Sequence, residues 1–152
     1  MIAGIDPGAS GALAVIDKGR VLDVLDVPKV SGEVDNVAWA RAWVPLLGQA
    51  DHVWIERVHA MPRQGVTSMF NFGQRYGFVI GLVSALGVPV SYVRPAEWKR
   101  KVGVAVKADK AASRIRAGEI FPDSAALWRR KADEGKAEAA LIAYHGFLCS
   151  GA

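Results

Sequence analysis

The chain has 152 residues and a mass of 16.3 kDa, which suits a single core, and we expect one domain over residues 1–152. With 51% hydrophobic and 22% charged residues, the composition excludes an intrinsically disordered chain. The net charge of +4 and the pI of about 9.4 suit a surface that binds nucleic acid, but a merely soluble basic surface has the same composition.

The only cysteine, Cys149, excludes an internal disulfide and a zinc site built on cysteines. Apolar runs such as residues 78–86 are shorter than the roughly 20 residues that span a bilayer. The N-terminus lacks the basic segment followed by an apolar one that marks a signal peptide. We therefore expect a cytoplasmic protein with no membrane partner.

Three antiparallel strands are predicted at the start of the chain. Residues 2–6 form a short apolar run that ends in PGASG, a turn composition, and a second apolar run follows at residues 12–17. Lys18 and Gly19 make the next turn, and residues 21–27 form a third run of mostly branched apolar residues. This order predicts a hairpin followed by a third strand.

Helices and strands alternate in the middle of the chain. Residues 34–47 carry apolar residues at spacings of three and four, which predicts an amphipathic helix whose last turn is disturbed by Pro45. Residues 52–58 predict a fourth strand. A long helix is predicted at residues 68–86, and residues 90–94 predict a fifth strand.

Three helices are predicted in the last third of the chain. They lie at residues 95–101, at residues 107–120 and from about residue 132 to residue 148. Together with the earlier elements they predict an α/β fold, in which a mixed sheet of five strands, three antiparallel and then two parallel, is flanked by helices.

Carboxylates occur at three places that a folded chain can bring together. Asp6 ends the first strand, Glu56 interrupts the apolar pattern of the fourth, and the last helix carries Asp133, Glu134 and Glu138. Positions 134 and 138 are one helical turn apart and share a face. Converging carboxylates repel one another, so such a cluster implies bound cations. Each acid also has an ordinary structural explanation, as a turn cap, an edge-strand charge or a solvent-facing helix residue.

The residue types favour hydrolysis assisted by divalent metal ions. Mg²⁺ and Mn²⁺ prefer oxygen ligands, and two ions about 4 Å apart stabilise the attacking and leaving oxygens of a phosphodiester. The sequence has no Ser-His-Asp pattern of obvious spacing, no Walker-type phosphate loop and no pair of histidines spaced to bind a metal. Residues 6–11 also match the phosphate loop of actin-like sugar kinases, but those proteins need a second nucleotide-binding domain, for which 152 residues leave no room.

Four segments carry motifs in a characteristic order. They are the opening strand at 2–8 (IAGIDPG), the acidic strand at 55–58 (IERV), part of the long helix at 72–77 (FGQRYG) and the last helix at 136–143 (KAEAALIA). These segments resemble the RuvC-type Holliday junction resolvases, particularly the compact versions carried by phages. The resemblance implies an RNase H-like fold, two Mg²⁺ or Mn²⁺ ions, and a homodimer that acts on DNA in a bacterial or phage-infected cell.

The same resemblance implies roles for individual acids. The implied metal ligands are Asp6, Glu56 and Glu138. A fourth acid is expected about one helical turn before Glu138, where the family spacing of three falls on Gly135, which has no side chain. We interpret Glu134 as this fourth ligand, with Asp133 as its alternative.

Contacts to DNA are assigned to basic side chains. Lys110 resembles a family lysine near the scissile phosphate, a role for which Lys107 competes. The residues predicted to bind DNA are Arg63, Arg75, Lys99, Arg100, Lys101, Lys107, Lys110 and Arg114. Trp98 is the best aromatic candidate for contacting DNA, although tryptophan is usually a core residue. Related resolvases carry an aromatic wedge after the second acidic strand, and here the loop at residues 57–67 offers only His59 and Met61 beside Arg63.

Gly73, Gly77 and Gly81 recur every four residues in the long helix, and each costs roughly 1 kcal/mol of helix stability relative to alanine. A smooth glycine ridge lets another backbone approach closely. The resemblance implies that this helix contributes to a homodimer interface, and packing on the chain's own sheet is the alternative.

The sequence therefore predicts an endonuclease that resolves Holliday junctions or other branched DNA by hydrolysis with two metal ions. One alternative is a related nuclease of broader specificity, which cuts flaps, forks or RNA-containing duplexes with the same metal centre. The other is a catalytically inactive module that binds junctions.

Overall fold

A computed structural model describes residues 1–59, 65–106, 109 and 111–151. Its centre is a five-stranded sheet in the order β3-β2-β1-β6-β7. The strands are β1 (Ile2–Asp6), β2 (Ala12–Asp17), β3 (Arg20–Asp26), β6 (His52–Glu56) and β7 (Val90–Val93). β1, β2 and β3 pair antiparallel, while β6 and β7 join β1 in parallel. The predicted mixed sheet of three antiparallel and two parallel strands is therefore confirmed.

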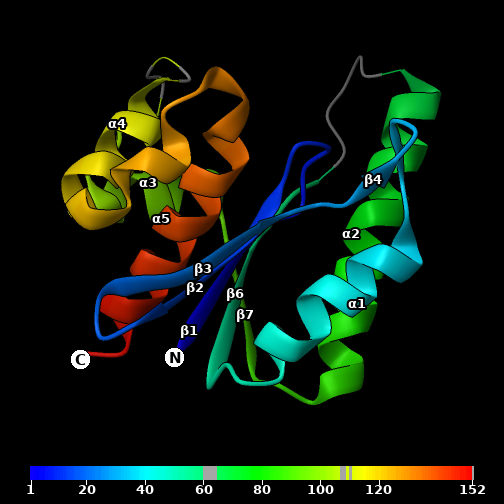
Figure 1. Ribbon diagram of the computed structural model, residues 1–152, viewed down its shortest axis with the longest axis horizontal. Coiled ribbons are helices and arrows are strands. Elements are labelled where there is room, and N and C mark those ends of the chain that lie inside the picture. Colours follow the sequence, from blue (N-terminus) through cyan, green and yellow to red (C-terminus); the bar gives the residue numbers. More distant parts are fainter. Residues whose placement is uncertain (60–64, 107–108, 110, 152) are drawn as a thin grey trace.

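Helices cover both faces of this sheet (Figure 1). One face packs against α1 (Asn36–Leu47) and α2 (Val66–Leu86), the other against α3 (Pro95–Val102), α4 (Ala111–Ile120) and α5 (Glu134–Cys149). Each face has its own core of buried apolar side chains, because residues along each strand alternate between the two faces. Among the helices of the described chain, none is long and apolar enough to cross a membrane.

Two short features were not predicted from the sequence. β4 (Lys29–Val30) and β5 (Glu33–Val34) form a small hairpin, whose turn residues Ser31 and Gly32 have positive φ angles of 52° and 86°. Two 3-10 helices, η1 (Pro122–Trp128) and η2 (Lys131–Asp133), precede α5, so the last helix begins at Glu134 rather than at about residue 132. β4, β5 and η2 are only two or three residues long, too short to carry a hydrophobic period, which is why the sequence does not reveal them.

Helix α5 lies directly on β1 because both elements present small residues at their contact. A Cβ atom on Gly4 would overlap the backbone nitrogen of Ala143 and the carbonyl oxygen of Ala139. One on Gly135, in the first turn of α5, would overlap the carbonyl oxygen of Ser10 in the turn after β1. The backbones of helix and strand therefore touch, and this contact fixes the height of α5 above the end of β1.

The glycine ridge of α2 faces outward. No neighbouring element of the described chain lies within 4 Å of a Cβ built on Gly73, Gly77 or Gly81. The alternative that these glycines pack on the chain's own sheet is therefore wrong for the described residues. The sheet is instead contacted by the opposite side of the helix, through residues such as Val79 and Val83.

Replacing Gly4 with alanine is expected to destabilise the protein by at least about 2 kcal/mol, because the new methyl group meets backbone atoms that no side-chain rotation can move aside. Urea unfolding followed by circular dichroism measures this free energy. The matched control is Gly118→Ala in α4, where the new Cβ would lie 3.9 Å from Trp128 Nε1, an ordinary contact, so stability should stay constant or rise. Equal midpoints for the two variants would contradict the close approach.

Candidate active site

Asp6 and Glu56 end two neighbouring parallel strands on the same face of the sheet. The register pairs Ile5 of β1 with Ile55 of β6, so the next residue on each strand is an acid. Ile5 and Ile55 are buried in the core under α1 and α2. Because side chains alternate along a strand, Asp6 and Glu56 point to the opposite face, which α5 covers.

Glu138 reaches the same region from α5. Its Oε1 accepts a hydrogen bond from Ser113 Oγ at 3.0 Å and pairs with Lys99 Nζ at 3.3 Å. The same Lys99 Nζ lies 5.2 Å from the centroid of the Trp98 ring, within the range of a cation–π interaction. Glu138 is thus held by side chains of α3 and α4, and Lys99, predicted to bind DNA, lies at the acids.

Asp6 is the electrostatic centre of the cluster. The pKa of its carboxyl is raised to about 7, chiefly by burial and then by the negative charges of Glu56, Glu138 and Glu134, against the opposing hydrogen bond from the Gly8 amide. That amide donates to Asp6 Oδ1 at 2.9 Å, so Asp6 also caps the turn after β1. Three carboxylates, one on β6 and two on α5, therefore lie close enough to Asp6 to disfavour its ionised form.

Glu56 is positioned by a tryptophan. Trp98 Nε1 donates a hydrogen bond to Glu56 Oε1 at 2.8 Å, while the Trp98 side chain is 0% exposed in the core under α3 and α5. Burial raises the pKa of Glu56, an effect opposed by this hydrogen bond and by the nearby charge of Lys99. The interpretation of Trp98 as a DNA-facing aromatic is wrong, because its ring is buried and its N–H is used to orient a site carboxylate.

The two candidates for the fourth acid, Asp133 and Glu134, lie in different environments. Asp133 is buried and bound by Arg130 through both guanidinium and backbone N–H groups, which together hold the pKa of the Asp133 carboxyl at about 2. Asp133 is therefore part of the turn before α5. Glu134 is half-buried, and its charge contributes to the raised pKa of Asp6. Gly135, where the family spacing would put an acid, has no room for a side chain because Ser10 lies against it.

The carboxylates lie near one another but are not arranged as a complete metal-binding site in the described residues. Within the described ranges, no three Asp, Glu, His or Cys side chains converge as ligands of one ion. Glu56 and Glu138 point instead to Trp98, Ser113 and Lys99. The donor set nevertheless fits a hard divalent cation, because it consists of carboxylate oxygens whose mutual repulsion a cation would relieve.

The other residues predicted to bind DNA are spread over several surfaces. Arg63, Lys107 and Lys110 lie outside the described residues. Arg100 and Lys101 line a hollow near the end of α5, together with His145 and Cys149, on a different part of the surface from Lys99.

Two further residues that were predicted to bind DNA, Arg114 and Arg75, lie against other segments of the chain. Arg114 Nη1 donates to the carbonyl oxygen of Arg129 at 3.1 Å, which ties α4 to the segment after η1. Arg75 lines a polar groove between α2 and the β4–β5 hairpin, with Asn71 and Glu33 among its neighbours.

One exposed aromatic residue on α2 was not identified from the sequence. Phe70 in the first turns of α2 is 65% exposed, and Val66 one turn earlier is exposed as well. Both lie on the opposite side of the helix from the core residues Val79 and Val83. The sequence signal for its exposure is that Phe70 falls outside the spacing of the core positions of α2.

Asp6→Asn is expected to stabilise the protein at pH 8 in a metal-chelating buffer. A folded-state pKa above the unfolded value means that the contribution of Asp6 is fully present below about pH 4 and is lost as the pH rises through about 7. The change from 3.8 to about 7 corresponds to roughly 4 kcal/mol at most. Chemical unfolding at several pH values measures the difference between variant and wild type.

That difference should be small near pH 4 and grow toward pH 8. The exposed Asp123, changed to asparagine, is the control and should differ from wild type by a constant amount. If the free energies of unfolding of Asp6→Asn and wild type change in parallel between pH 5 and pH 8, the pKa of Asp6 is not raised in the folded protein.

Comparison with known proteins places this geometry in a known fold. No protein-family model and no curated protein sequence matches the chain. Among solved structures, the chain is similar to RuvC of T. thermophilus in complex with a Holliday junction substrate, with a TM-score of 0.70 and 20% identity over 99% of this chain and 94% of that one. It is also similar to another structure of Thermus thermophilus RuvC, with a TM-score of 0.63 and 18% identity over 98% of this chain and 96% of that one.

These matches cover nearly the whole chain and therefore include the central sheet and the helices on both of its faces. The resemblance seen in the sequence motifs is confirmed at the level of structure. The chain has the RuvC fold, an RNase H-like mixed sheet of five strands flanked by helices.

Proposed function

We propose that this protein is an endonuclease that cuts branched DNA, with the four-way junction as its preferred substrate, by hydrolysis with two Mg²⁺ or Mn²⁺ ions. The observation that carries the proposal is the meeting of Asp6, Glu56, Glu138 and Glu134 at the ends of two parallel strands of a RuvC fold. A solved structure with this fold is bound to a Holliday junction substrate.

The four acids would hold the metal ions. Bound there, divalent ions would supply an activated water and stabilise the charge that develops on the phosphate. Trp98 would keep Glu56 oriented through its N–H, and Ser113 would do the same for Glu138. Lys99, which now balances the charge of Glu138, lies close enough to the acids to bind the phosphate of an incoming strand.

A homodimer would present two such sites to the paired strands of a junction. The outward face of α2 supports this part of the proposal, since it joins the exposed Val66 and Phe70 to the ridge of Gly73, Gly77 and Gly81. A twofold axis along this face would bring the same patch of each protomer together. Within this arrangement we propose Phe70 as the aromatic residue that stacks on bases where the strands separate.

The broader nuclease and the inactive module remain the competing functions. Titration of one preparation against a four-way junction, a flap and an RNA–DNA hybrid separates a junction enzyme from a broader one. An inactive module would bind the four-way junction but would leave it uncut in Mg²⁺.

Asp6→Asn and Glu138→Gln are each expected to slow junction cleavage by at least roughly a hundredfold, because each removes a charge that would hold a metal ion worth several kcal/mol in the transition state. The rate is measured on a labelled junction in Mg²⁺ under single-turnover conditions. Asp123→Asn, which also removes one exposed carboxylate, should retain the wild-type rate. Wild-type activity in either site variant would overturn the assignment.

Gly77→Arg is expected to convert a dimer into a monomer, because the side chain would stand on the smooth face of α2 where a second backbone would approach. Sedimentation equilibrium measures the mass. Arginine at the exposed Ala126 in η1 adds the same charge elsewhere and should leave the mass unchanged. A wild-type protein that sediments as a monomer at high concentration would remove the dimer from the proposal.

A further inference from the structure

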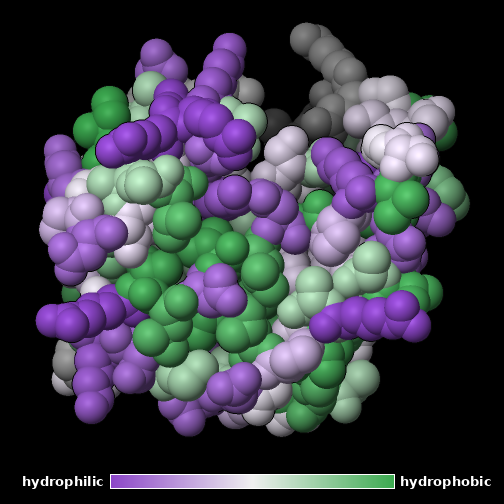
Figure 2. All heavy atoms as spheres, viewed as in Figure 1, coloured by the Kyte–Doolittle hydropathy of each residue, from purple (hydrophilic) through white to green (hydrophobic). Residues whose placement is uncertain are grey.

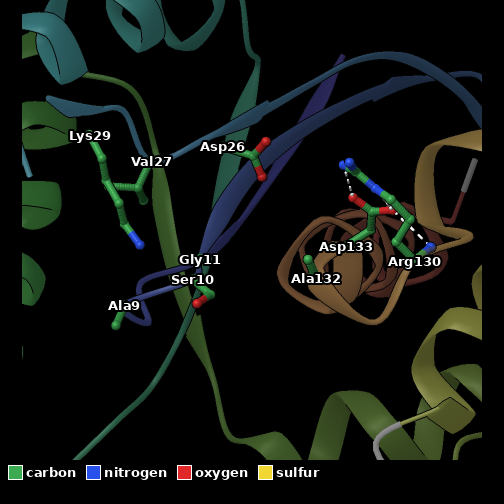
Figure 3. A pocket seen from close by; sticks show the side chains of 9 residues that line it. All are labelled: Ala9, Ser10, Gly11, Asp26, Val27, Lys29, Arg130, Ala132 and Asp133. Carbon is green, nitrogen blue, oxygen red and sulfur yellow. Dashed lines mark hydrogen bonds and ion pairs between the residues drawn. The ribbon is translucent and has the colours of Figure 1, made fainter. Parts of the chain in front are cut away.

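A recess lies beside the turn that follows Asp6. It lies between the turn after β1, the end of β3 and the segment before α5, and has a volume of about 300 Å³ (Figure 3). The residues that line it are Ala9, Ser10, Gly11, Asp26, Val27, Lys29, Arg130, Ala132 and Asp133. We call it the turn recess.

The turn recess and the acids share one piece of backbone. The amide of Gly8 donates to Asp6, and the amide of Gly11 donates to the carbonyl of Gly8 at 3.0 Å, so the turn is closed around Asp6. Ser10 contacts Gly135 of α5, the neighbour of Glu134. The turn therefore has the candidate metal ligands at its base and the recess along its outer part.

Arg130 is held in a fixed position at the recess. Its Nη2 and Nε donate to the two carboxylate oxygens of Asp133 at 2.8 and 3.2 Å, and its backbone amide donates to Asp133 as well. Asp133 is 3% exposed, whereas the Arg130 side chain is 74% exposed. Nη1 makes no hydrogen bond within the described part of the chain, so the guanidinium presents a preorganised donor to solvent.

Lys29 lies on the other side of the recess from Arg130 (Figure 3). It is exposed at the start of β4 and has no ion pair with any described residue. Lys136 pairs with Asp26 at 2.9 Å and lies 3.6 Å from Asp133, which Arg130 also binds. Three cations, Arg130, Lys29 and Lys136, therefore face two carboxylates, Asp26 and Asp133, and the charges sum to +1. The recess therefore has a cation on each side and a net positive charge.

We propose that the turn recess binds a backbone phosphate of the DNA strand next to the one being cut, through Arg130 and Lys29. The inference rests on the proposed function. The lining favours a phosphate over a base, because it contains no aromatic ring and no side-chain amide with which to stack on or read a base edge. Figure 2 shows hydrophilic side chains around a hydrophobic area at the centre of this face.

The test measures DNA affinity rather than cleavage. Fluorescence anisotropy with a labelled four-way junction, and with a duplex of the same sequence, is recorded over a salt series in the Asp6→Asn background, which leaves the DNA intact. Lys29→Gln and Arg130→Gln are each expected to weaken binding about three- to tenfold. Each should also reduce the slope of log affinity against log salt by about 0.7 to 0.9, the value for one lost phosphate contact. The loss should be equal for junctions of different sequence.

Arg20→Gln is the matched control. It removes one positive charge from the opposite end of β3, away from the recess, and should change affinity less than twofold. If Lys29→Gln and Arg130→Gln behave like Arg20→Gln while the parent protein binds the junction, the recess is not a phosphate site and the proposed function stands. If the parent protein binds neither junction nor duplex, both proposals fail.

Asp133→Asn tests the fixed position of Arg130 by the sign of its effect. Removing a negative charge near DNA would by itself strengthen binding, whereas release of Arg130 from its partner should weaken it. We expect weaker binding, and tighter binding would overturn the role of Asp133. Arg130→Lys, which keeps the charge and loses the two-point contact, should fall between wild type and Arg130→Gln, and a wild-type affinity would argue against a fixed donor.

Discussion

The contact between the backbones of α5 and β1 is the constraint on which the candidate site depends. Gly4 on the strand and Ala139 and Ala143 on the helix leave no space for larger side chains. The helix therefore cannot tilt or rise without losing this contact. Since Glu138 precedes Ala139, its carboxylate is fixed above the end of the sheet, where Asp6 and Glu56 also lie.

Holding these acids together works against the stability of the fold. Asp6 is pushed toward its neutral form, and the neighbouring side chains relieve only part of the repulsion: Trp98 donates to Glu56, while Ser113 and Lys99 bind Glu138. These three residues come from α3 and α4, which otherwise pack on the outer side of α5. The two helices therefore contribute both apolar cover for α5 and polar partners for the acids.

The sequence predicts the elements that have a clear hydrophobic period, and these include every strand of the central sheet. It also predicts that Asp6, Glu56, Glu138 and Glu134 meet, because strand ends and helical spacing place them. It does not predict the partner of Glu56. Trp98 looks like a DNA-facing residue beside Lys99 and Arg100, and only the three-dimensional packing shows that its ring is buried and its N–H points inward. Contacts between residues far apart in the chain, here 56 and 98, have no signature in local pattern.

The turn after β1 explains why the acid near Asp6 in the first turn of α5 is at position 134 and not at position 135. Ser10 lies so close to the first turn of α5 that position 135 must be glycine. An acid on this side of the helix therefore has to occupy position 134 in place of position 135. The same close approach brings the outer part of the turn beside Arg130, whose partner Asp133 immediately precedes the helix. The spacing of the acids and the shape of the turn recess therefore both follow from the close packing between the start of α5 and the turn after β1.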